Sequence, residues 1–469
     1  MDTKALRQKI LDLAIHGKLV PQNPKDEPAS VLLERIRTEK ERLIKEGKIK
    51  KGKKSAKTSD KPHYPYELPK GWEWTTVGEI SQSILYGVSE SAKSHGAYKL
   101  LRITDIQNNF VNWETVPFTD YDESKAESYL LKDGDILFAR TGATVGKSYL
   151  VKNLQEKAIY ASYLIRVQTI NYVLPEFVKY FFESGYYWNQ IQCSSVGIGQ
   201  PNVNGTILSN LKLPIPPLKE QKRIVEELTE WLRFIDNIEE DKENLQTAIN
   251  RAKSKVLDLA IHGKLVPQAP NDEPASELLK RINPKAEIIS DNGHYQKLPL
   301  GWCLTTLGSI GTWQSGATPS RLRKDYYGGN IPWLKTGDLN DDIIANIPEF
   351  ITEKALDETS VKLNPTGSIL IAMYGATIGK IGILSFPATT NQACCACVDY
   401  KIDKMYIFYY LLSNRANFIS MGGGGAQPNI SKEKIVNTIF PLPPLEEQKR
   451  IVSKIEEIFA QLDAIETAL

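Results

Sequence analysis

Hydrophobic residues between Ile224 and Leu259 recur at spacings that alternate between four and three residues, broken only where Lys242 occupies a seam position. This 3.5-residue period is typical of a coiled-coil seam, the line of apolar side chains along which two helices pack. Pro216 and Pro217 precede the segment and Gly263 follows it, and these residue types favour a helix start and a helix end. The pattern predicts a central helix of about 44 residues, roughly 65 Å long. One apolar face on such a helix requires a partner helix to bury it.

Both ends of the chain carry pieces of the same pattern. The last residues repeat the first half of the central seam, and the first residues repeat its second half, so that Leu469 corresponds to Lys242 and Met1 to Thr247. We therefore expect tail and head to form a split helix packed against the central one, with Met1 and Leu469 about 8 Å apart. The predicted seam comprises Leu6, Ile10, Leu13, Ile224, Leu228, Trp231, Ile235, Ile238, Leu245, Ile249, Val256, Leu259, Ile451, Ile455, Ile458, Leu462 and Ile465.

Shorter patterns fill the stretches between these helices. Residues 133–140, 367–375 and 393–400 are apolar runs bounded by polar or glycine residues, which predicts short buried strands. Residues 177–191 and 405–419 have helical periodicity, and we expect one amphipathic helix from each. Strands and helices mixed in this way predict the α+β class.

The chain also repeats itself over more than 200 residues, which indicates a duplicated domain rather than a solenoid. We expect two similar α+β modules related by a pseudo-two-fold axis and separated by a pair of long antiparallel helices. The matching segments are 11–36 with 257–282, 68–80 with 298–310, 101–107 with 334–340, 139–147 with 372–380, and 200–228 with 427–455.

The boundaries of the repeats divide the chain into seven predicted segments. In order, these segments are an N-terminal helical segment (1–45), a basic linker (46–62), a first module (63–217), the central helical region (218–283), a linker (284–297), a second module (298–444) and a C-terminal helix (445–469). The first and the last segment each supply one half of the split helix.

Composition limits the possible classes of protein. The chain has 58 Lys and Arg against 56 Asp and Glu, and this net charge of +2 does not by itself indicate a nucleic-acid binder. Residues 45–61 are rich in lysine in the first copy alone, and both a solvated linker and a salt-sensitive DNA contact remain open for them. Five cysteines without disulfide-like spacing, no apolar leader and no long apolar run predict a cytoplasmic protein.

Motifs that suggest catalysis or metal binding fail on their spacing. GATVGKS (142–148) has three residues between its glycines, whereas a phosphate-binding loop needs four. Cys394, Cys395 and Cys397 have no second pair of ligands at metal-binding spacing, so a buried strand is favoured. The sequence therefore predicts no catalytic residues, no metal site and no enzyme.

Several motifs occur twice and in the same order: LDLAIHGKLVPQ followed by DEPASxLLxRI, LPxGWxxTTxG, GATxGK, QPN and PPLxEQKRIV. Together they closely resemble the specificity subunit of type I restriction–modification enzymes, over nearly the whole chain. The resemblance implies two target-recognition domains, each reading one half of a bipartite double-stranded DNA target. It also implies that the helices set the spacer between the half-sites and dock two methyltransferase (modification) subunits.

The same resemblance places the chemistry on partner subunits. S-adenosylmethionine, ATP and magnesium are expected there and no cofactor in this chain, and restriction/translocase subunits would join the complex. Two alternatives stay open. One is a modification-only subunit without a nuclease partner, and the other is a coiled-coil adaptor whose two modules bind proteins or small ligands.

Comparison of the two copies suggests which residues contact DNA. Positions shared by both copies cannot explain different half-sites, so they are expected to serve folding, phosphate contacts or docking. Base readers are expected where the copies diverge, at 83–99, at 313–330 and beside the GAT motif, since Arg can bridge a guanine edge and Gln an adenine edge. The candidates are Tyr86, Ser89, Ser91, Lys93, His95, Arg102, Arg140, Thr141, Lys147, Gln200, Asn202, Gln314, Ser315, Thr318, Ser320, Arg321, Arg323, Lys335, Tyr374, Lys380, Gln427 and Asn429.

Overall fold

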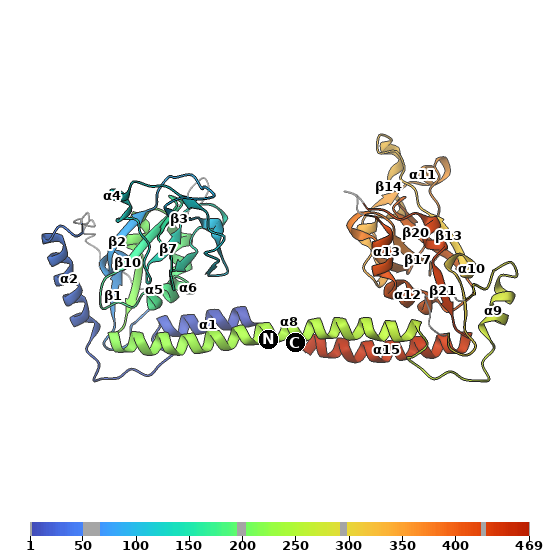
Figure 1. The fold of residues 1–469 in the computed structure, drawn as a ribbon, viewed down its shortest axis with the longest axis horizontal. Helices are drawn as coiled ribbons and strands as arrows, with labels where there is room; N and C mark the ends of the chain where they lie inside the picture. The colour runs from blue at the N-terminus through green and yellow to red at the C-terminus, as the bar shows by residue number, and fades with distance from the viewer. Residues whose placement is uncertain (1, 50–65, 195–202, 291–297, 424–427, 469) are drawn as a thin grey trace. The chain divides into compact units, whose positions relative to one another are not determined.

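A computed structural model describes residues 2–49, 66–194, 203–290, 298–423 and 428–468 (Figure 1). The chain divides into two compact units, Met1–Asp241 and Lys242–Leu469, and the boundary falls within a single long helix. Each unit is described by itself below. The predicted approach of Met1 to Leu469 lies outside the described residues.

The long helix is α8, Leu218–Ile261, whose 44 residues match the predicted central helix. In unit 1, helix α1 (Thr3–Ile15) lies along the first part of α8 (Figure 1). Arg7 of α1 forms an ion pair with Asp236 at 2.5 Å, whereas Asp26, beyond the end of α1, reaches Arg223 at 2.7 Å. The order of these contacts shows that α1 and α8 run antiparallel.

Unit 2 contains the second helix pair, in which α15 (Leu445–Ala468) lies along the later part of α8 (Figure 1). Lys253 of α8 forms ion pairs with Asp463 at 2.6 Å and with Glu466 at 3.1 Å. As predicted, the head of the chain thus pairs with the central helix in unit 1, and the tail pairs with it in unit 2.

The seam residues fall into three groups. Those buried are Ile10, Ile224, Leu228, Ile235, Ile249, Ile451 and Ile455. Those half-buried are Leu6, Leu13, Ile238, Val256, Leu259, Ile458 and Leu462. Trp231, Leu245 and Ile465 are exposed, and for these three the prediction was wrong.

The misplaced seam residues have a geometric cause. A straight helix drifts by about 20° per heptad from a 3.5-residue repeat, so a single partner helix covers a narrower stripe than the sequence pattern suggests. The α/β part of each unit packs against another stripe instead. There Leu11 and Ala14 of α1 and Leu257 and Ala260 of α8 are buried.

Unit 1 is built on a four-stranded antiparallel sheet in the order β2-β10-β7-β8. Its strands are β2 (Ser81–Tyr86), β7 (Ile136–Ala139), β8 (Ser148–Leu150) and β10 (Leu164–Thr169). Smaller sheets are formed by β1 (Glu73–Thr76) with β11 (Lys212–Ile215), by β4 (Ile106–Gln107) with β5 (Phe110–Val111), and by β3 (Tyr98–Leu101) between β6 (Phe118–Thr119) and β9 (Ala158–Tyr160). The remaining helices are α2 (Ala29–Lys45), α3 (Val77–Ile80), α4 (Glu123–Ala126), α5 (Pro175–Phe181), α6 (Gly185–Ser194) and α7 (Gly205–Asn210).

Unit 2 repeats this main sheet in the order β13-β20-β17-β18 and adds β15 at the edge. Its strands are β13 (Gly311–Ser315), β15 (Ile343–Ile344), β17 (Ile369–Ala372), β18 (Ile381–Leu384) and β20 (Cys394–Tyr400). The other strands are β12 (Cys303–Thr306) with β21 (Ile439–Leu442), and β14 (Tyr327–Leu334) between β16 (Phe350–Ile351) and β19 (Thr389–Thr390). The helices are α9 (Ala275–Ile282), α10 (Leu307–Ile310), α11 (Glu353–Glu358), α12 (Lys404–Ser413), α13 (Arg415–Met421) and α14 (Lys432–Val436).

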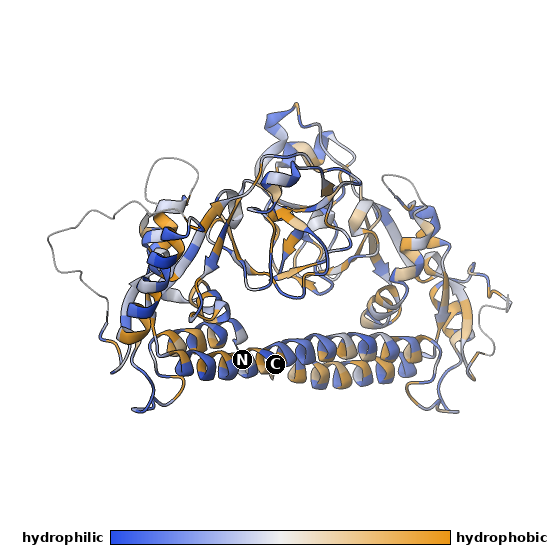
Figure 2. Ribbon diagram, turned by 60° about the vertical axis from the view of Figure 1, so that its left-hand side comes forward, coloured by the Kyte–Doolittle hydropathy of each residue, from blue (hydrophilic) through white to orange (hydrophobic). Residues whose placement is uncertain are grey.

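Each unit has a main hydrophobic core between one face of its sheet and its helices. In unit 1, Phe138 of the sheet and Phe181 of α5 belong to the same buried cluster as Ile10 of α1 and Leu228 of α8. Figure 2 shows hydrophobic residues concentrated in the strands, and hydrophobic and hydrophilic stretches alternating along the long helix. The module and its helix pair therefore share one core, which confirms the α+β prediction.

Two expected helices are each broken in two. Residues 177–191 contain the end of α5 and most of α6, and residues 405–419 contain most of α12 and part of α13. In unit 1 the Ser184 hydroxyl donates to the Phe181 carbonyl at 2.7 Å and accepts from the Tyr187 N–H at 3.3 Å. Such side-chain bonds compete with helical ones, so the continuous apolar pattern did not reveal the break.

The repeated PPLxEQKRIV motif connects the long helices to each module. In unit 1, Gln221 accepts a hydrogen bond from the Leu174 N–H at 3.0 Å and donates to the Pro216 carbonyl at 3.0 Å. Gln448 makes the same two bonds in unit 2, to the Asp403 N–H and the Pro443 carbonyl. Buried polar groups require such partners, which gives this part of the repeat a structural explanation.

Candidate nucleic-acid interface

The two GATxGK motifs form tight turns within the main sheets. Gly142–Thr144 is a 3-10 turn between β7 and β8, and Gly375–Thr377 is its counterpart between β17 and β18. The glycines of both turns have positive φ, +78° at Gly142 and +65° at Gly375, a conformation that side chains with a Cβ rarely adopt. The motif therefore follows a hairpin geometry, and no helix begins there as in a phosphate-binding loop.

The segment after the QPN motif lies beside this turn in both units. In unit 1 the Val203 N–H donates to the Arg140 carbonyl at 3.0 Å, and in unit 2 the Ile430 N–H donates to the Met373 carbonyl at 2.9 Å. Asn429 also forms a β-bridge with Tyr374. Gln200, Asn202 and Gln427 lie outside the described residues. Motifs far apart in the sequence thus meet at one end of each main sheet.

In unit 1 this end of the sheet brings Tyr86 and Arg140 together. Tyr86 is the last residue of β2, and its hydroxyl accepts a hydrogen bond from the Gly205 N–H at 2.7 Å. Arg140 follows β7, and its guanidinium carbon lies 4.8 Å from the centre of the Tyr86 ring. The Arg140 N–H donates to the carbonyl of Tyr163, whose side chain is 61% exposed. Tyr86 and Tyr163 are thus both neighbours of the positively charged Arg140 at this end of the sheet.

Arg140 lacks the partners that a partly buried cation normally has. Its Nε atom is buried without a hydrogen-bond partner, and Arg140 makes no ion pair with any carboxylate in the described part of the chain. Removing a guanidinium nitrogen from water without a partner costs free energy, so the site favours an acceptor from outside the protein. A guanine edge and a phosphate oxygen are both such acceptors.

Sequence reasoning missed Tyr163. In unit 2 the Met373 N–H donates to the Ala393 carbonyl at 2.8 Å, so Ala393 occupies the place of Tyr163. This exchange of tyrosine for alanine is a divergence of the same kind as Arg140 against Met373. It was overlooked because the residues before β10 and β20 carry no repeated motif that aligns them.

The other candidates of unit 1 lie farther along the chain. The loop after β2 begins at Gly87, where a Cβ atom would lie 2.2 Å from the Tyr160 carbonyl oxygen, so only glycine fits. Ser89, Ser91, Lys93 and His95 follow in this loop and are exposed, whereas Thr141 is half-buried. Two of the predicted cations are already neutralised, because Lys93 pairs with Asp120 at 3.0 Å and Arg102 with Asp105 at 2.7 Å.

In unit 2 several predicted base readers contact other side chains. Gln314 donates to the Asn364 side chain at 2.7 Å, and the Thr318 hydroxyl donates to the Gln392 side chain. Ser315 is half-buried, and Ser320 and Tyr374 are exposed. The loop starts at Gly316, whose Cβ position would clash with the Asn391 carbonyl oxygen at 2.3 Å, just as at Gly87.

Three of the four candidate cations of unit 2 form ion pairs and lie beside aromatic rings. Arg321 lies 4.4 Å from the Tyr327 ring centre and 5.0 Å from that of Trp333, and it pairs with Glu349 at 2.5 Å. Lys335 pairs with the same carboxylate at 2.5 Å. The hydrogen bond from Arg321, followed by that from Lys335, holds the pKa of Glu349 below its ordinary value.

Arg323 belongs to a neighbouring group of charges. It pairs with Asp325 at 2.7 Å and lies 4.5 Å from the centre of the Tyr326 ring. Lys354 pairs with the same Asp325 at 2.9 Å. Arg321, Arg323 and Lys335 are therefore held by carboxylates, in contrast to Arg140.

Lys147 and Lys380 end the two GATxGK motifs and occupy equivalent backbone positions. Their N–H groups donate to Thr144 and Thr377, respectively. Neither lysine has an ion-pair partner among the residues that the structure describes. Each module thus presents an unpaired positive charge next to side chains that differ between the modules, an arrangement that suits DNA: shared charges for phosphates and divergent neighbours for bases.

Comparison with known proteins identifies the family. The sequence model of the type I restriction modification DNA specificity domain matches residues 69–247 and 299–469, well over half of the chain. The chain belongs to the specificity subunits of type I restriction–modification enzymes. These subunits are the DNA-recognition components of their complexes and are not themselves enzymes.

A curated relative supports this assignment, and two solved structures share the fold. The specificity subunit of the type I restriction enzyme EcoAI from Escherichia coli is 29% identical over 97% of this chain and 88% of its own length. A chain solved in work on complex assembly and conformational transition of the type I restriction–modification system superposes with a TM-score of 0.61, at 22% identity over 86% of this chain and 94% of that one. The HsdS subunit from Thermoanaerobacter tengcongensis gives a TM-score of 0.50, at 20% identity over 86% and 93%.

The cysteines predicted to lie on a buried strand do so in this specificity subunit. Cys394, Cys395 and Cys397 lie buried on β20, as the sequence predicted, and burial raises the pKa of the Cys395 and Cys397 thiols to about 12. Within the described ranges, no group of three His, Cys, Asp or Glu residues could hold a metal ion. No helix in the same ranges is long and apolar enough to cross a membrane.

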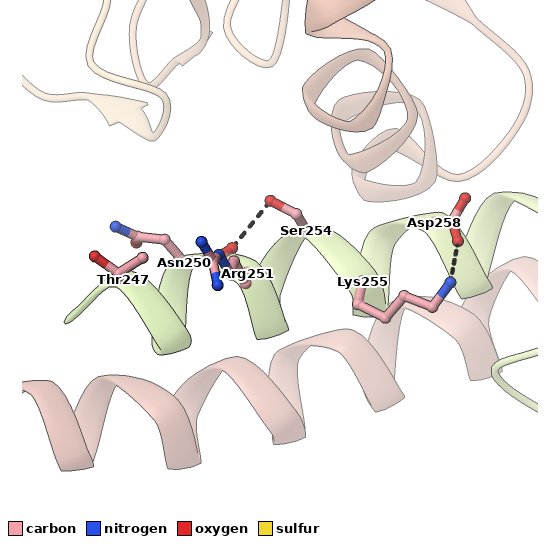
Figure 3. Close-up of a pocket in the computed structure, with 6 residues that line it drawn as sticks. All are labelled: Thr247, Asn250, Arg251, Ser254, Lys255 and Asp258. Carbon is pink, nitrogen blue, oxygen red and sulfur yellow. Dashed lines mark hydrogen bonds and ion pairs between the residues drawn. The ribbon is translucent and has the colours of Figure 1, made fainter. Parts of the chain in front are cut away.

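A depression of about 520 Å³ lies on the polar face of α8 in unit 2 (Figure 3). Residues from this single helix line it: Thr247, Asn250, Arg251, Ser254, Lys255 and Asp258. Asp258 pairs with Lys255 at 2.7 Å. Its repeat equivalent in unit 1, Asp12, instead accepts a hydrogen bond from the Gly185 N–H at the start of α6. Among the described residues, Asp258 accepts no corresponding hydrogen bond from the second module.

Proposed function

We propose that each module of this specificity subunit reads one half of a bipartite DNA target through the end of its main sheet. The first module would do so around Tyr86, Arg140 and Tyr163, and the second around Thr318, Arg321 and Tyr374. The arrangement at the GATxGK turns carries the proposal, since it places one unpaired lysine in each module beside residues that differ between them. Lys147 and Lys380 would contact phosphates, and their divergent neighbours would contact bases.

Replacing Lys147 or Lys380 by alanine is expected to weaken DNA binding equally for all sequences. Each substitution removes about one phosphate contact, so the slope of log affinity against log salt should become shallower by about 0.9. The measurement is the fluorescence anisotropy of labelled duplexes titrated with the subunit in complex with its methyltransferase, from about 50 to 200 mM salt. A drop in affinity for one DNA sequence alone would contradict the phosphate assignment. Unchanged slopes in both variants would contradict the location of the interface.

We further propose that the α1–α8 helix pair docks a methyltransferase subunit through Trp231 and Phe234. These side chains are 40% and 55% exposed, and their rings meet edge to face with centres 6.3 Å apart. Large aromatic residues exposed together are typical anchors of protein interfaces. S-adenosylmethionine, ATP and magnesium would bind to partner subunits, in keeping with a chain that supplies recognition rather than chemistry.

Replacing Trp231 and Phe234 together by alanine is expected to weaken methyltransferase binding by at least about 100-fold, since interface anchors often contribute 2 kcal/mol or more each. Analytical ultracentrifugation of the co-expressed subunits would measure the loss. The thermal unfolding temperature of the variant should stay near that of the original chain, because both side chains are largely outside the core. Normal complex formation by the double variant would place the docking surface elsewhere.

A further inference from the structure

The second module neutralises its cations with one carboxylate in particular. Glu349 places one oxygen 2.5 Å from Arg321 and the other 2.5 Å from Lys335. Its side chain is 23% exposed, against 54% for Arg321 and 44% for Lys335. The carboxylate therefore lies beneath two cations that reach into solvent, and two positive charges share one negative charge.

The framework around Glu349 fixes this arrangement. The Trp333 N–H donates to the Glu349 carbonyl at 2.8 Å, and the Trp333 indole N–H donates to the Ala317 carbonyl at 3.1 Å. The Tyr327 hydroxyl donates to the Pro319 carbonyl at 2.5 Å. Since Arg321 lies against the rings of both Trp333 and Tyr327, its guanidinium is positioned before any DNA arrives.

This cluster is continuous with the proposed reading edge of the module. The Asn391 N–H donates to the carbonyl of Leu334, the residue before Lys335, at 2.9 Å. The next residue, Gln392, accepts the hydrogen bond from Thr318, and Ala393 accepts the one from Met373 beside Tyr374. Hydrogen bonds of three consecutive residues, 391–393, thus connect the cluster of Arg321 and Lys335 with Tyr374.

The arginine beside an aromatic ring in the first module has a different environment. Arg140 lies against Tyr86 much as Arg321 lies against Tyr327, but in the described part of unit 1 no carboxylate pairs with it. The two modules therefore present a free and a neutralised arginine on comparable aromatic supports.

We propose that Glu349 is a specificity-determining positioning residue, which keeps Arg321 and Lys335 from binding DNA phosphates while leaving them able to bind neutral base edges. The inference rests on the proposed function of the second module. A phosphate carries a full negative charge and must approach against the charge of Glu349, whereas guanine is a neutral base whose O6 and N7 atoms carry only partial negative charges and meet a much weaker repulsion. The carboxylate thereby lowers affinity for non-target DNA more than affinity for the target.

The test compares Glu349→Gln with Glu353→Gln in the complex with the methyltransferase. Glu353 is an exposed carboxylate at the start of α11 without an ion pair in the described residues, so its loss changes the net charge of the same module equally. Labelled duplexes would carry either the motif methylated in cells or a scrambled version of it. Anisotropy titrations over a range of salt concentrations would give affinities and salt slopes.

Glu349→Gln is expected to raise the affinity for scrambled DNA about tenfold and the affinity for the motif less than threefold. The salt slope on scrambled DNA should steepen by about 1 to 2, because each new phosphate contact contributes about 0.9. Glu353→Gln should change neither quantity appreciably. In a background with Arg321→Ala and Lys335→Ala, the effect of Glu349→Gln should disappear.

Equal effects of the two glutamate substitutions would overturn the proposal, since they would show a general charge effect. An equal rise for both DNA sequences, or an unchanged salt slope, would overturn it too. Thermal unfolding of each variant separates these results from damage to the fold. Failure of the original complex to prefer its motif would instead refute the proposed function of the module, and that outcome is visible before any variant is tested.

Discussion

Replacing Arg140 by alanine is expected to weaken recognition of one half of the DNA target and to leave recognition of the other half intact. Arg140 is a half-buried cation whose Nε atom has no hydrogen-bond partner, and its guanidinium lies over the ring of Tyr86 where the first module differs from the second. A good bidentate contact to a base is worth about 1–3 kcal/mol of discrimination, so affinity for the full target should fall by roughly 5- to 150-fold. Sequence preference should relax at positions of one half-site.

Methylation mapping of cells that carry the variant with its methyltransferase measures this effect directly. The matched control is Lys147→Ala in the same module, which should lower methylation at every site without changing the motif. Arg140→Lys keeps the charge but cannot form the planar, bidentate and stacked contact, and it should behave like the alanine variant. A relaxed motif in both halves, or a uniform loss at all sites, would show that Arg140 does not read a base.

Replacing Ile235 by aspartate is expected to separate α1 from α8 and to destabilise unit 1 by about 4 kcal/mol. Ile235 is fully buried in the core cluster that also contains Ile10 of α1 and Leu228 of α8. A carboxylate there loses the packing of a large aliphatic side chain and has to be buried without a partner. Destabilisation on this scale exceeds what a surface substitution causes, and the complex with the methyltransferase should not assemble.

The matched control is Asn237→Asp, which introduces the same charge two residues away at an exposed position of α8. Chemical denaturation of both variants, followed by circular dichroism, gives the difference in unfolding free energy. The control should stay within about 0.5 kcal/mol of the original chain. Similar stability of the two variants would mean that the α1–α8 contact contributes little to the fold.

The repeat allowed much of the fold to be predicted from the sequence. The central helix, its pairing with the head and the tail of the chain, and the strands around Phe138, Ile371 and Cys395 follow from apolar periodicity, since burial of that pattern is what folds them. Periodicity could not locate the breaks at Ser184 and Asn414, because polar residues that end a helix differ little from those on its solvent side. It also could not show which seam residues the module covers, as the exposure of Trp231 illustrates.

The electrostatics of the candidate site could not be predicted from the sequence. Divergence between the copies pointed to Arg140 and to the loop that contains Arg321, and their role in reading bases stays a prediction. Whether an arginine is free or paired depends on residues distant in sequence, such as Glu349 for Arg321, and no local pattern reveals that partner. Tyr163 was missed for a related reason, since only the backbone contact with Arg140 reveals its position.

The measurement that tests the central claim most directly is a genome-wide map of methyladenine. It compares cells that carry this subunit with its methyltransferase and cells from which this chain alone has been deleted. We expect a two-part motif with a fixed gap that disappears on deletion. We also expect Arg140→Ala to relax one part of the motif and Glu349→Gln to increase methylation at sites outside the motif. A methylation pattern that persists unchanged without this chain, while the methyltransferase is present, would contradict its role in choosing the DNA target.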